Sequence, residues 1–304
     1  MQFRLWKRMG MAVGFLPFST VGYSLSNTSE LTKDEDGTVI NKTASYAGDG
    51  GLQQVFAGVG FKVLDNLSIG ANISYIYGDI THSVTTAFSN SSSFSSVRLD
   101  KISINDYKLD FGLQYSYKFN KKHVLNFGAV YSLGHSVNGK GYKYNQKWLN
   151  GADYPSTQTG DTITNAFSLP HTFGAGLTYV YDNRLTIGAD FTYQQWEDAK
   201  FYNEKSYFSN RTKIAAGAEF VPNPYSRNYL KRVRYRVGGY YSDPYTKVDG
   251  QDGTREYGVS AGFGFPLFQS KSILNISGQY VRVSPKVKGM LEENYLKINI
   301  GLTF

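Results

Sequence analysis

Apolar residues alternate with polar residues and glycine along much of this chain. Between Leu109 and Phe119 every second residue is apolar or aromatic, and the residues in between are charged, polar or glycine. The same alternation runs from Leu185 to Tyr193 and from Leu296 to Phe304. A repeat of two residues is that of a β-strand with one apolar face, and about ten residues are enough for a tilted strand to cross a bilayer. The pattern therefore predicts strands long enough to span a membrane.

Twelve such strands are predicted, and the connections between them fall into two classes. The strands are 7–18, 51–64, 66–80, 105–119, 122–136, 165–181, 184–197, 210–221, 231–243, 254–266, 271–284 and 292–304. Short turns, such as Asp65-Asn66 and Asp182-Asn183, join them at one end, although 222–230 is long for this class. Longer polar connections are predicted at the other end, at 19–50, 81–104, 137–164, 198–209, 244–253 and 285–291. This asymmetry is typical of bacterial outer-membrane barrels, whose short turns face the periplasm.

Two features favour a membrane barrel over a soluble β-sandwich or a lipocalin-like barrel, which the same alternation would allow. The polar face of the predicted strands is rich in glycine and small residues, and the apolar face carries aromatic residues near both strand ends. These are Tyr115, Tyr117, Phe119, Tyr179 and Tyr181 at one end, and Tyr75, Tyr77, Tyr193 and Tyr241 at the other. Aromatic girdles mark both surfaces of the membrane in transmembrane barrels. The sequence therefore predicts an all-β fold, a transmembrane antiparallel up-and-down β-barrel, as a single domain covering 1–304.

Composition narrows the classes of function. The chain has 25 Tyr, 20 Phe and 32 Gly among 304 residues, a balance that favours strands over helices. No run of about 18 apolar residues lacks a charge, which excludes a transmembrane helix. The net charge of +8 forms no dense basic run, so nucleic-acid binding is not expected. Cysteine is absent and no motif for a metal, a phosphate group or a dinucleotide occurs, so we expect no cofactor and no metal site.

Four segments, in order, resemble the FadL family of outer-membrane transport proteins. They are 51–82, a strand pair around an Asp-Asn turn; 168–198, with Leu169-Pro170 and Trp196; 211–248; and 254–304. The resemblance implies a barrel of fourteen strands behind an amino-terminal hatch, so this chain is expected to lack the hatch and the first two strands. It also implies a location in the bacterial outer membrane and no enzymatic activity. The implied function is uptake of hydrophobic compounds, such as long-chain fatty acids, by diffusion through the barrel.

Two parts of the chain bear on how such a ligand would enter and leave. In the family a lateral opening lies beside a kinked strand that corresponds here to 7–18, where Gly14 and Pro17 are suitable kink residues. A proline that simply ends the strand is the alternative. The segment 81–104 is shorter and richer in serine than the family's ligand-capture loop. The better candidate capture surface is 137–164, with Tyr142, Tyr144, Trp148 and Tyr154.

Cations are predicted on the lumen side of the barrel. If the apolar face meets lipid, the alternate positions that point inward include Arg232, Arg234, Arg236, Lys213 and Lys297. Arginine can bind a carboxylate through two parallel hydrogen bonds, so these residues are candidate ligand-binding residues for a fatty acid. The alternative is that the arginines form salt bridges with Asp190, Glu219 or Glu256 that only brace the barrel.

Other functions remain open from the sequence. A protein-binding barrel would use polar loops as a scaffold or shuttle for secreted proteins, and a general porin would need an open polar lumen. A hydrolase of the outer wall would pair Ser168 with His171, but no orienting carboxylate is evident, so no catalytic residue is assigned. The last strand ends in Phe304, the type of signal that barrel-assembly machinery reads during folding. The expected partners are therefore a hydrophobic ligand, outer-membrane lipid and this machinery.

Overall fold

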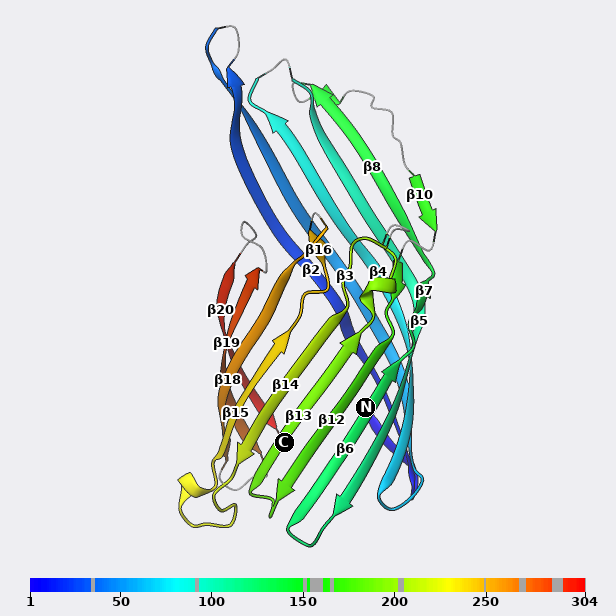
Figure 1. Ribbon diagram of the computed structural model, residues 1–304, viewed down its shortest axis with the longest axis vertical. Coiled ribbons are helices and arrows are strands. Elements are labelled where there is room, and N and C mark those ends of the chain that lie inside the picture. The colour runs from blue at the N-terminus through cyan, green and yellow to red at the C-terminus, as the bar shows by residue number, and fades with distance from the viewer. Residues whose placement is uncertain are drawn as a thin grey trace.

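The computed structural model describes residues 1–33, 36–90, 93–149, 152–153, 161–164, 167–201, 205–248, 250–267, 272–285 and 292–303. Thirteen strands follow one another in a single antiparallel sheet, each paired with the next, which is an up-and-down arrangement (Figure 1). They are β1 (Gln2–Trp6), β2 (Met9–Lys33), β3 (Val39–Lys62), β4 (Leu67–Phe88), β5 (Ser95–Lys118), β6 (His123–Ser132), β12 (Thr172–Tyr181), β13 (Leu185–Gln194), β14 (Arg211–Phe220), β15 (Arg234–Ser242), β18 (Thr254–Pro266), β19 (Ile273–Pro285) and β20 (Glu293–Thr303). The predicted fold class is confirmed, and β1 is a short strand beyond the twelve that the sequence predicts.

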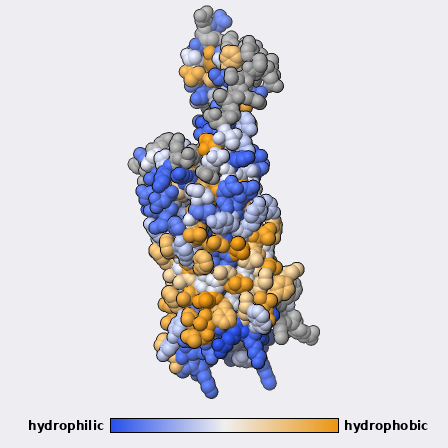
Figure 2. Space-filling view, turned by 90° about the vertical axis from the view of Figure 1, so that its right-hand side faces the viewer, coloured by the Kyte–Doolittle hydropathy of each residue, from blue (hydrophilic) through white to orange (hydrophobic). Residues whose placement is uncertain are grey.

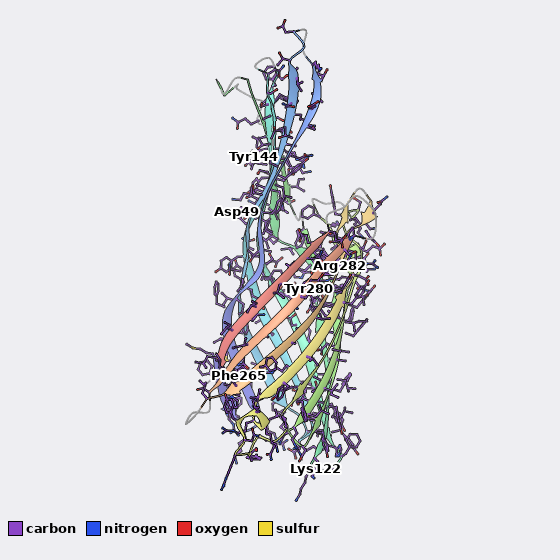
Figure 3. All side chains as sticks on the ribbon, turned by 90° about the vertical axis from the view of Figure 1, so that its left-hand side faces the viewer. Asp49, Lys122, Tyr144, Phe265, Tyr280 and Arg282 are labelled. Atoms are coloured by element: carbon purple, nitrogen blue, oxygen red, sulfur yellow. The ribbon has the colours of Figure 1, made fainter. Side chains whose placement is uncertain are left out.

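The sheet curls into a barrel whose two ends differ (Figure 3). Short turns join the strands at the end near Lys122, which we call the turn end, and longer connections lie at the opposite mouth end. The strands β1 and β20 form the two edges of the sheet, and no pairing joins them within the described residues. No helix in the described part of the chain is long and apolar enough to cross a membrane.

An apolar belt covers the outward face of the strands. Ile214 on β14 is half-exposed, and Leu296, Ile298 and Ile300 on β20 are more exposed still. Figure 2 shows the belt as a band of apolar side chains in the lower part of one face, with polar surface above and below it. A protein dissolved in water rarely exposes an apolar surface of this extent. The outward face is therefore the lipid-facing wall that the alternation predicts.

The lumen face is built from small and polar residues. Glycine lies opposite glycine across successive strand pairs, with Gly60 between Gly10 and Gly70, and Gly70 next to Gly112. A glycine adds no side chain to the wall, so this part of the lumen stays wide. The small residues that the sequence places on the polar face thus leave space inside the barrel.

The mouth end differs from the sequence prediction. The segments 19–50, 81–104 and 137–164 were expected to be polar loops, but the strands β2, β3, β4 and β5 run on through most of them (Figure 1). They are joined at one side by β8 (Gly139–Leu149), β9 (Ala152–Asp153) and β10 (Asp161–Thr164). We call this extension the projecting sheet. The prediction of loops was wrong because polar residues dominate these stretches and apolar alternation is confined to short runs, such as Val21, Tyr23 and Leu25, although the stretches pair as strands.

Two glycines mark the level at which β3 and β4 enter the projecting sheet. Gly50 has φ of +108° and Gly78 has φ of +143°, values that side chains disfavour. A Cβ atom on Gly50 would lie 2.3 Å from the carbonyl oxygen of Asp79, and one on Gly78 would lie 2.3 Å from that of Gly51. At both positions the backbone conformation would aim a Cβ atom at the carbonyl of the paired strand, so only glycine is tolerated.

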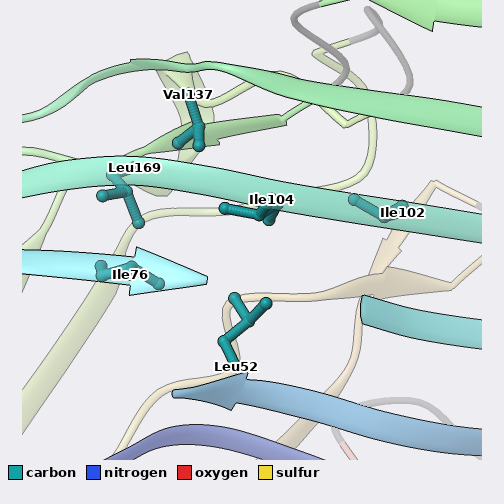
Figure 4. Packing of buried hydrophobic residues seen from close by; sticks show 6 residues of the cluster. All are labelled: Leu52, Ile76, Ile102, Ile104, Val137 and Leu169. Carbon is teal, nitrogen blue, oxygen red and sulfur yellow. The ribbon is translucent and has the colours of Figure 1, made fainter. Parts of the chain in front are cut away.

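A compact apolar core lies at the same level, inside the mouth. It joins β3, β4 and β5 to two short paired strands, β7 (His135–Val137) and β11 (Phe167–Leu169). The buried side chains of this core are Leu52, Ile76, Ile102, Ile104, Val137 and Leu169 (Figure 4). Burying one such side chain stabilises a fold by roughly 1.5–3 kcal/mol, so this cluster fixes the base of the projecting sheet against the mouth.

Candidate functional site

Aromatic side chains from the mouth connections pack together beside this core. Trp196 lies in the short 3-10 helix η1 (Trp196–Asp198), with its ring centroid 5.2 Å from that of Phe208 and 5.1 Å from that of Tyr245. Phe167 lies 6.3 Å from Trp196, and Phe201 lies 5.8 Å from Phe208. We call these five residues the mouth cluster. Rings at these separations attract one another beyond the burial of their surface, so the mouth connections are held in place.

The mouth cluster and the apolar core line a common cavity of about 700 Å³. Its apolar lining includes Phe18, Leu52, Ile80, Ile102, Ile104, Leu169 and all five residues of the mouth cluster. Its polar lining includes His82, Lys108, Thr172, Gln194 and Arg211. A cavity of this size, mostly apolar with a few polar groups, has the character of a small-molecule site.

The two cations of the cavity differ in how they are engaged. The ammonium group of Lys108 pairs with Asp110, which also accepts a hydrogen bond of 2.5 Å from the Ser132 hydroxyl. Arg211 donates from Nε to the Ser242 hydroxyl at 2.8 Å, and its guanidinium carbon lies 5.5 Å from the centre of the Tyr245 ring. Among the described residues no carboxylate lies within salt-bridge distance of Arg211. Arg211 is therefore the cation that remains able to meet an anionic group of a ligand.

An ion pair lies at the base of the projecting sheet, next in sequence to residues that line the cavity. Lys101 on β5 lies 3.0 Å from the carboxylate of Asp79 on β4. Hydrogen bonds from Ser103 and Lys101 lower the pKa of the Asp79 carboxyl below its usual value. The carboxylate stays charged at neutral pH and adds polar cross-strand contacts just beyond Gly78.

The predicted lumen arginines are tied to a carboxylate. Nη1 of Arg234 lies 3.2 Å from Glu219, and Nε of Arg236 donates to the other oxygen of Glu219 at 2.6 Å. Arg236 also donates to the side-chain oxygen of Asn275 at 2.7 Å. Glu219 on β14, one of the three acids that the sequence offers as bracing partners, therefore joins both arginines of the neighbouring strand β15.

The other predicted cations lie at other levels of the barrel. Lys213 is on the row of Thr192 and Ser242, near the mouth, with its ammonium 5.2 Å from the centre of the Tyr240 ring. Lys297 lies opposite Gln279, with its ammonium 4.9 Å from the centre of the Tyr295 ring. Arg232 is not on a strand, contrary to the predicted strand 231–243, because it follows the 3-10 helix η2 (Tyr229–Lys231) and β15 begins at Arg234. The five cations thus form no single site.

Replacing Glu219 with glutamine is expected to lower the free energy of unfolding by about 1 kcal/mol, because two guanidinium groups lose their carboxylate while water still reaches them. Denaturant unfolding of the detergent-folded barrel measures this change. The matched control is Asp190→Asn, which removes a lumen carboxylate that has no ion pair in the described part of the chain. An equal loss in both variants would contradict a specific role for the Glu219 contacts.

The remaining predicted residues are placed as follows. The pairing of β2 with β3 shifts register between Pro17 and Ser19, and a Cβ atom on Gly14 would lie 2.6 Å from the Phe56 ring. The lateral opening beside Gly14 and Pro17 stays a prediction.

Ser168 contacts the Ser136 hydroxyl at 3.4 Å. Nδ1 of His171 lies 2.8 Å from the Tyr131 hydroxyl, so the described hydrogen bonds do not join the serine to the histidine.

The four aromatic residues of the predicted capture surface lie only partly within the described structure. Tyr142 and Tyr144 lie on β8 of the projecting sheet, with ring centroids 6.4 Å apart. Tyr154 lies outside the described residues, and so does the side chain of Trp148. The mouth cluster, in contrast, was not singled out from the sequence. Its signal was the presence of Phe201, Phe208 and Tyr245 in connections that were expected to be polar, whereas Trp196 was predicted to end the strand 184–197.

The sequence model of one protein family covers the chain from end to end, matching residues 1–304. The chain belongs to the BamG family. No curated protein sequence matches it.

Solved structures similar to this BamG chain include a hydrocarbon channel, a FadL homologue and a toluene transporter. The CymD monoaromatic hydrocarbon channel is 11% identical, with a TM-score of 0.53, and the match covers 98% of this chain and 88% of that chain. A Pseudomonas aeruginosa FadL homologue is 14% identical, with a TM-score of 0.52 and coverage of 92% and 83%. The Ralstonia pickettii toluene transporter TbuX is 11% identical, with a TM-score of 0.52 and coverage of 97% and 89%.

These likenesses establish the fold of this BamG chain. The prediction of a FadL-type barrel is confirmed at the level of fold, since the matches extend over nearly the full chain. Fold alone does not transfer function, because one architecture hosts many activities. The BamG model, in turn, separates this family from that of the channels.

Proposed function

We propose that this chain is a protein-binding subunit that serves the barrel-assembly machinery in the bacterial outer membrane. The name of the family, BamG, associates it with the barrel-assembly (Bam) proteins. The observation that carries the proposal is the projecting sheet, in which four barrel strands continue past the apolar belt as a broad surface in water (Figures 1 and 2). Diffusion of a small molecule through a barrel does not require such a surface.

The face of the projecting sheet that turns toward the mouth has the composition of a protein-binding surface. Leu25 on β2 is 58% exposed, and Tyr23 and Tyr46 beside it are also exposed. The Tyr23 hydroxyl lies 3.0 Å from Nδ1 of His82 on β4, which fixes this ring across two strands. Exposed apolar and aromatic residues on a rigid polar sheet are typical of a protein interface.

Site-specific photo-crosslinking in cells tests the proposal. A photoreactive phenylalanine at Leu25 is expected to form adducts with barrel-assembly proteins or their client barrels. The control position is Val259, an exposed residue of the lipid-facing wall, which should give no protein adduct. Depletion of the chain should also lower the amount of other barrels in the outer membrane. Unchanged barrel levels together with no adduct at Leu25 would refute the proposal.

A second candidate function, uptake of hydrophobic compounds, is favoured by the mouth cavity. This cavity offers an apolar lining, an aromatic cluster and Arg211 without a carboxylate partner in the described residues. A molecule with an apolar body and one anionic end, such as a long-chain fatty acid, would satisfy both kinds of lining. The arginines near Glu219 would then be a later contact for the same anionic end on its way through the lumen.

Mass spectrometry of small molecules that co-purify with the protein tests this second candidate. In the double variant Phe208→Ala/Arg211→Ala the amount of co-purifying apolar ligand should fall at least 10-fold, because the ligand loses both an apolar and a charged contact. Arg234→Ala/Arg236→Ala tests the lumen arginines separately. Absence of an apolar ligand from the wild-type protein would leave the protein-binding role as the function to pursue.

A further inference from the structure

The connection between β14 and β15, residues 221–233, is longer than the other turns that the structure describes at its end of the barrel. The turns Asp65-Asn66 and Asp182-Asn183 are tight, whereas this connection is longer and contains the helix η2 (Figure 1). We call it the basic loop. Loops that are longer than their class requires commonly serve a function.

Hydrogen bonds within the basic loop hold it in one conformation. The side-chain oxygen of Asn223 accepts from the backbone N–H of Tyr225 at 3.0 Å. That of Asn228 accepts from the N–H of Leu230 at 3.0 Å and so caps η2. The N–H of Asn223 donates to the carbonyl of Lys231 at 2.8 Å, which closes the loop. The loop is therefore preorganised, so less conformational entropy is lost when it binds a partner.

The closed loop turns large side chains outward. Tyr225 is 93% exposed and Leu230 is 64% exposed, although Val221 and Val233 at the base of the loop are buried. Tyrosine and arginine are the residue types that most often dominate binding energy when they enter a partner's pocket. A rigid loop with a fully exposed tyrosine is suited to this role.

The charge of the loop has one sign. Arg227, Lys231 and Arg232 lie within it, and no aspartate or glutamate occurs from 221 to 233. Arg227 and Lys231 have no ion pair in the part of the chain that the structure describes. The neighbouring Glu219 is already engaged by Arg234 and Arg236. A partner that binds this loop is expected to carry carboxylates, because opposite charges speed the association of two proteins and like charges oppose it.

The rest of the turn end adds to this charge. Lys121 and Lys122 form the tip of the turn between β5 and β6, and Lys122 points away from the strands in Figure 3. Arg184 beside the next turn donates to the carbonyl of Pro222, which attaches the basic loop to β13. Lys121 and Lys122 thus add positive charge at this end of the barrel, where Asp65 is already paired with Arg8 and Lys62 and Asp182 lies in another turn.

We infer that the basic loop docks a periplasmic protein domain that presents an apolar pocket bordered by carboxylates, with Tyr225 entering the pocket. The inference rests on the proposed function, because it takes the partner to be a protein. It places that partner in the periplasm because the short turns of outer-membrane barrels face the periplasm. Preorganisation favours a protein over lipid as the partner, since head groups in a fluid membrane need no rigid loop to meet. Arg227 and Lys231, which follow the tyrosine in the same loop, contact the carboxylates.

Photo-crosslinking from position 225 of the full chain in cells, followed by direct binding, tests the inference. A photoreactive phenylalanine at Tyr225 is expected to give one adduct with a protein whose contacting surface is acidic. Arg227→Glu/Lys231→Glu should lower its yield roughly 10-fold, because two attractive contacts become repulsive. Tyr144→Ala, which removes an exposed tyrosine of the projecting sheet, is the matched control and should leave the yield unchanged.

The identified partner domain is then titrated against the barrel in nanodiscs of neutral lipid. Tyr225→Ala should weaken binding roughly 30-fold, the change that the loss of a central anchor residue produces. Adducts with phospholipid alone, or a protein adduct that is insensitive to charge reversal, would overturn the inference. Adducts from Leu25 report on the projecting sheet separately. If Leu25 gave adducts and position 225 gave none, the docking role of the basic loop would be rejected and the proposed function would be retained.

Discussion

Replacing Gly78 with valine is expected to prevent the barrel from reaching its folded state. The residue has φ of +143°, which a β-branched side chain does not tolerate, and its Cβ would lie 2.3 Å from the carbonyl oxygen of Gly51. The strain and the overlap together should cost about 3 kcal/mol or more, because neither strand can move without breaking the ladder around the apolar core. Electrophoresis without heating measures the folded fraction, since a folded barrel migrates differently from the unfolded chain.

Gly60→Ala is the control for this substitution. Gly60 is on the same strand as Gly51, it has an ordinary backbone conformation, and a Cβ on it would meet no atom within 4 Å. This variant should fold like the wild type. Normal folding of Gly78→Val would show that the backbone at the base of the projecting sheet can relax away from the conformation that requires glycine.

Replacing Trp196 with alanine is expected to release the mouth connections while the barrel itself stays folded. The indole packs against Phe167, Phe208 and Tyr245 and donates from Nε1 to Gln194 at 3.1 Å. Removing a packed tryptophan costs about 3 kcal/mol, most of it local to the ring's neighbours. Hydrogen exchange should rise in peptides that contain Phe208 and Tyr245. Any ligand of the mouth cavity should be lost as well.

Trp6→Ala is the matched control, because Trp6 is largely exposed next to the turn after β1. It should change neither the exchange at the mouth nor the unheated migration of the barrel. If Trp196→Ala left the exchange of the mouth peptides unchanged, the mouth cluster would not be what holds these connections.

The sequence was sufficient to predict the strands of the barrel wall but not those of the projecting sheet, which lies in water. Lipid selects apolar residues at every second position, so strands such as β13 and β20 are visible as alternation. In the projecting sheet both faces meet water, and residues such as Ser26 and Thr28 on β2 pair with Ser45 and Thr43 on β3 through side-chain hydroxyls. Such strands are specified by pairing with their neighbours. A single-chain pattern carries little information about that pairing.

Some residues of the candidate sites could also be predicted from the sequence and others could not. Period-two alternation was enough to place Arg234, Arg236 and Glu219 on the lumen face, and their contacts follow from the neighbouring positions of β14 and β15. It failed for Arg232, which lies in a turn, and for the mouth cluster. The rings of that cluster come from connections distant in sequence, such as those of Trp196 and Tyr245, and only the folded chain brings them together.

The continuity of β2, β3, β4 and β5 has a consequence for how this chain enters the membrane. The ends of these strands carry charged residues, among them Glu30, Lys33, Lys42 and Asp49, which must cross the hydrocarbon layer before they reach the far side. Placing one charged side chain at the bilayer centre costs about 3 kcal/mol, so unassisted translocation of each long hairpin would be slow. The chain should therefore depend on catalysed insertion more strongly than a barrel whose hairpins end at the membrane surface.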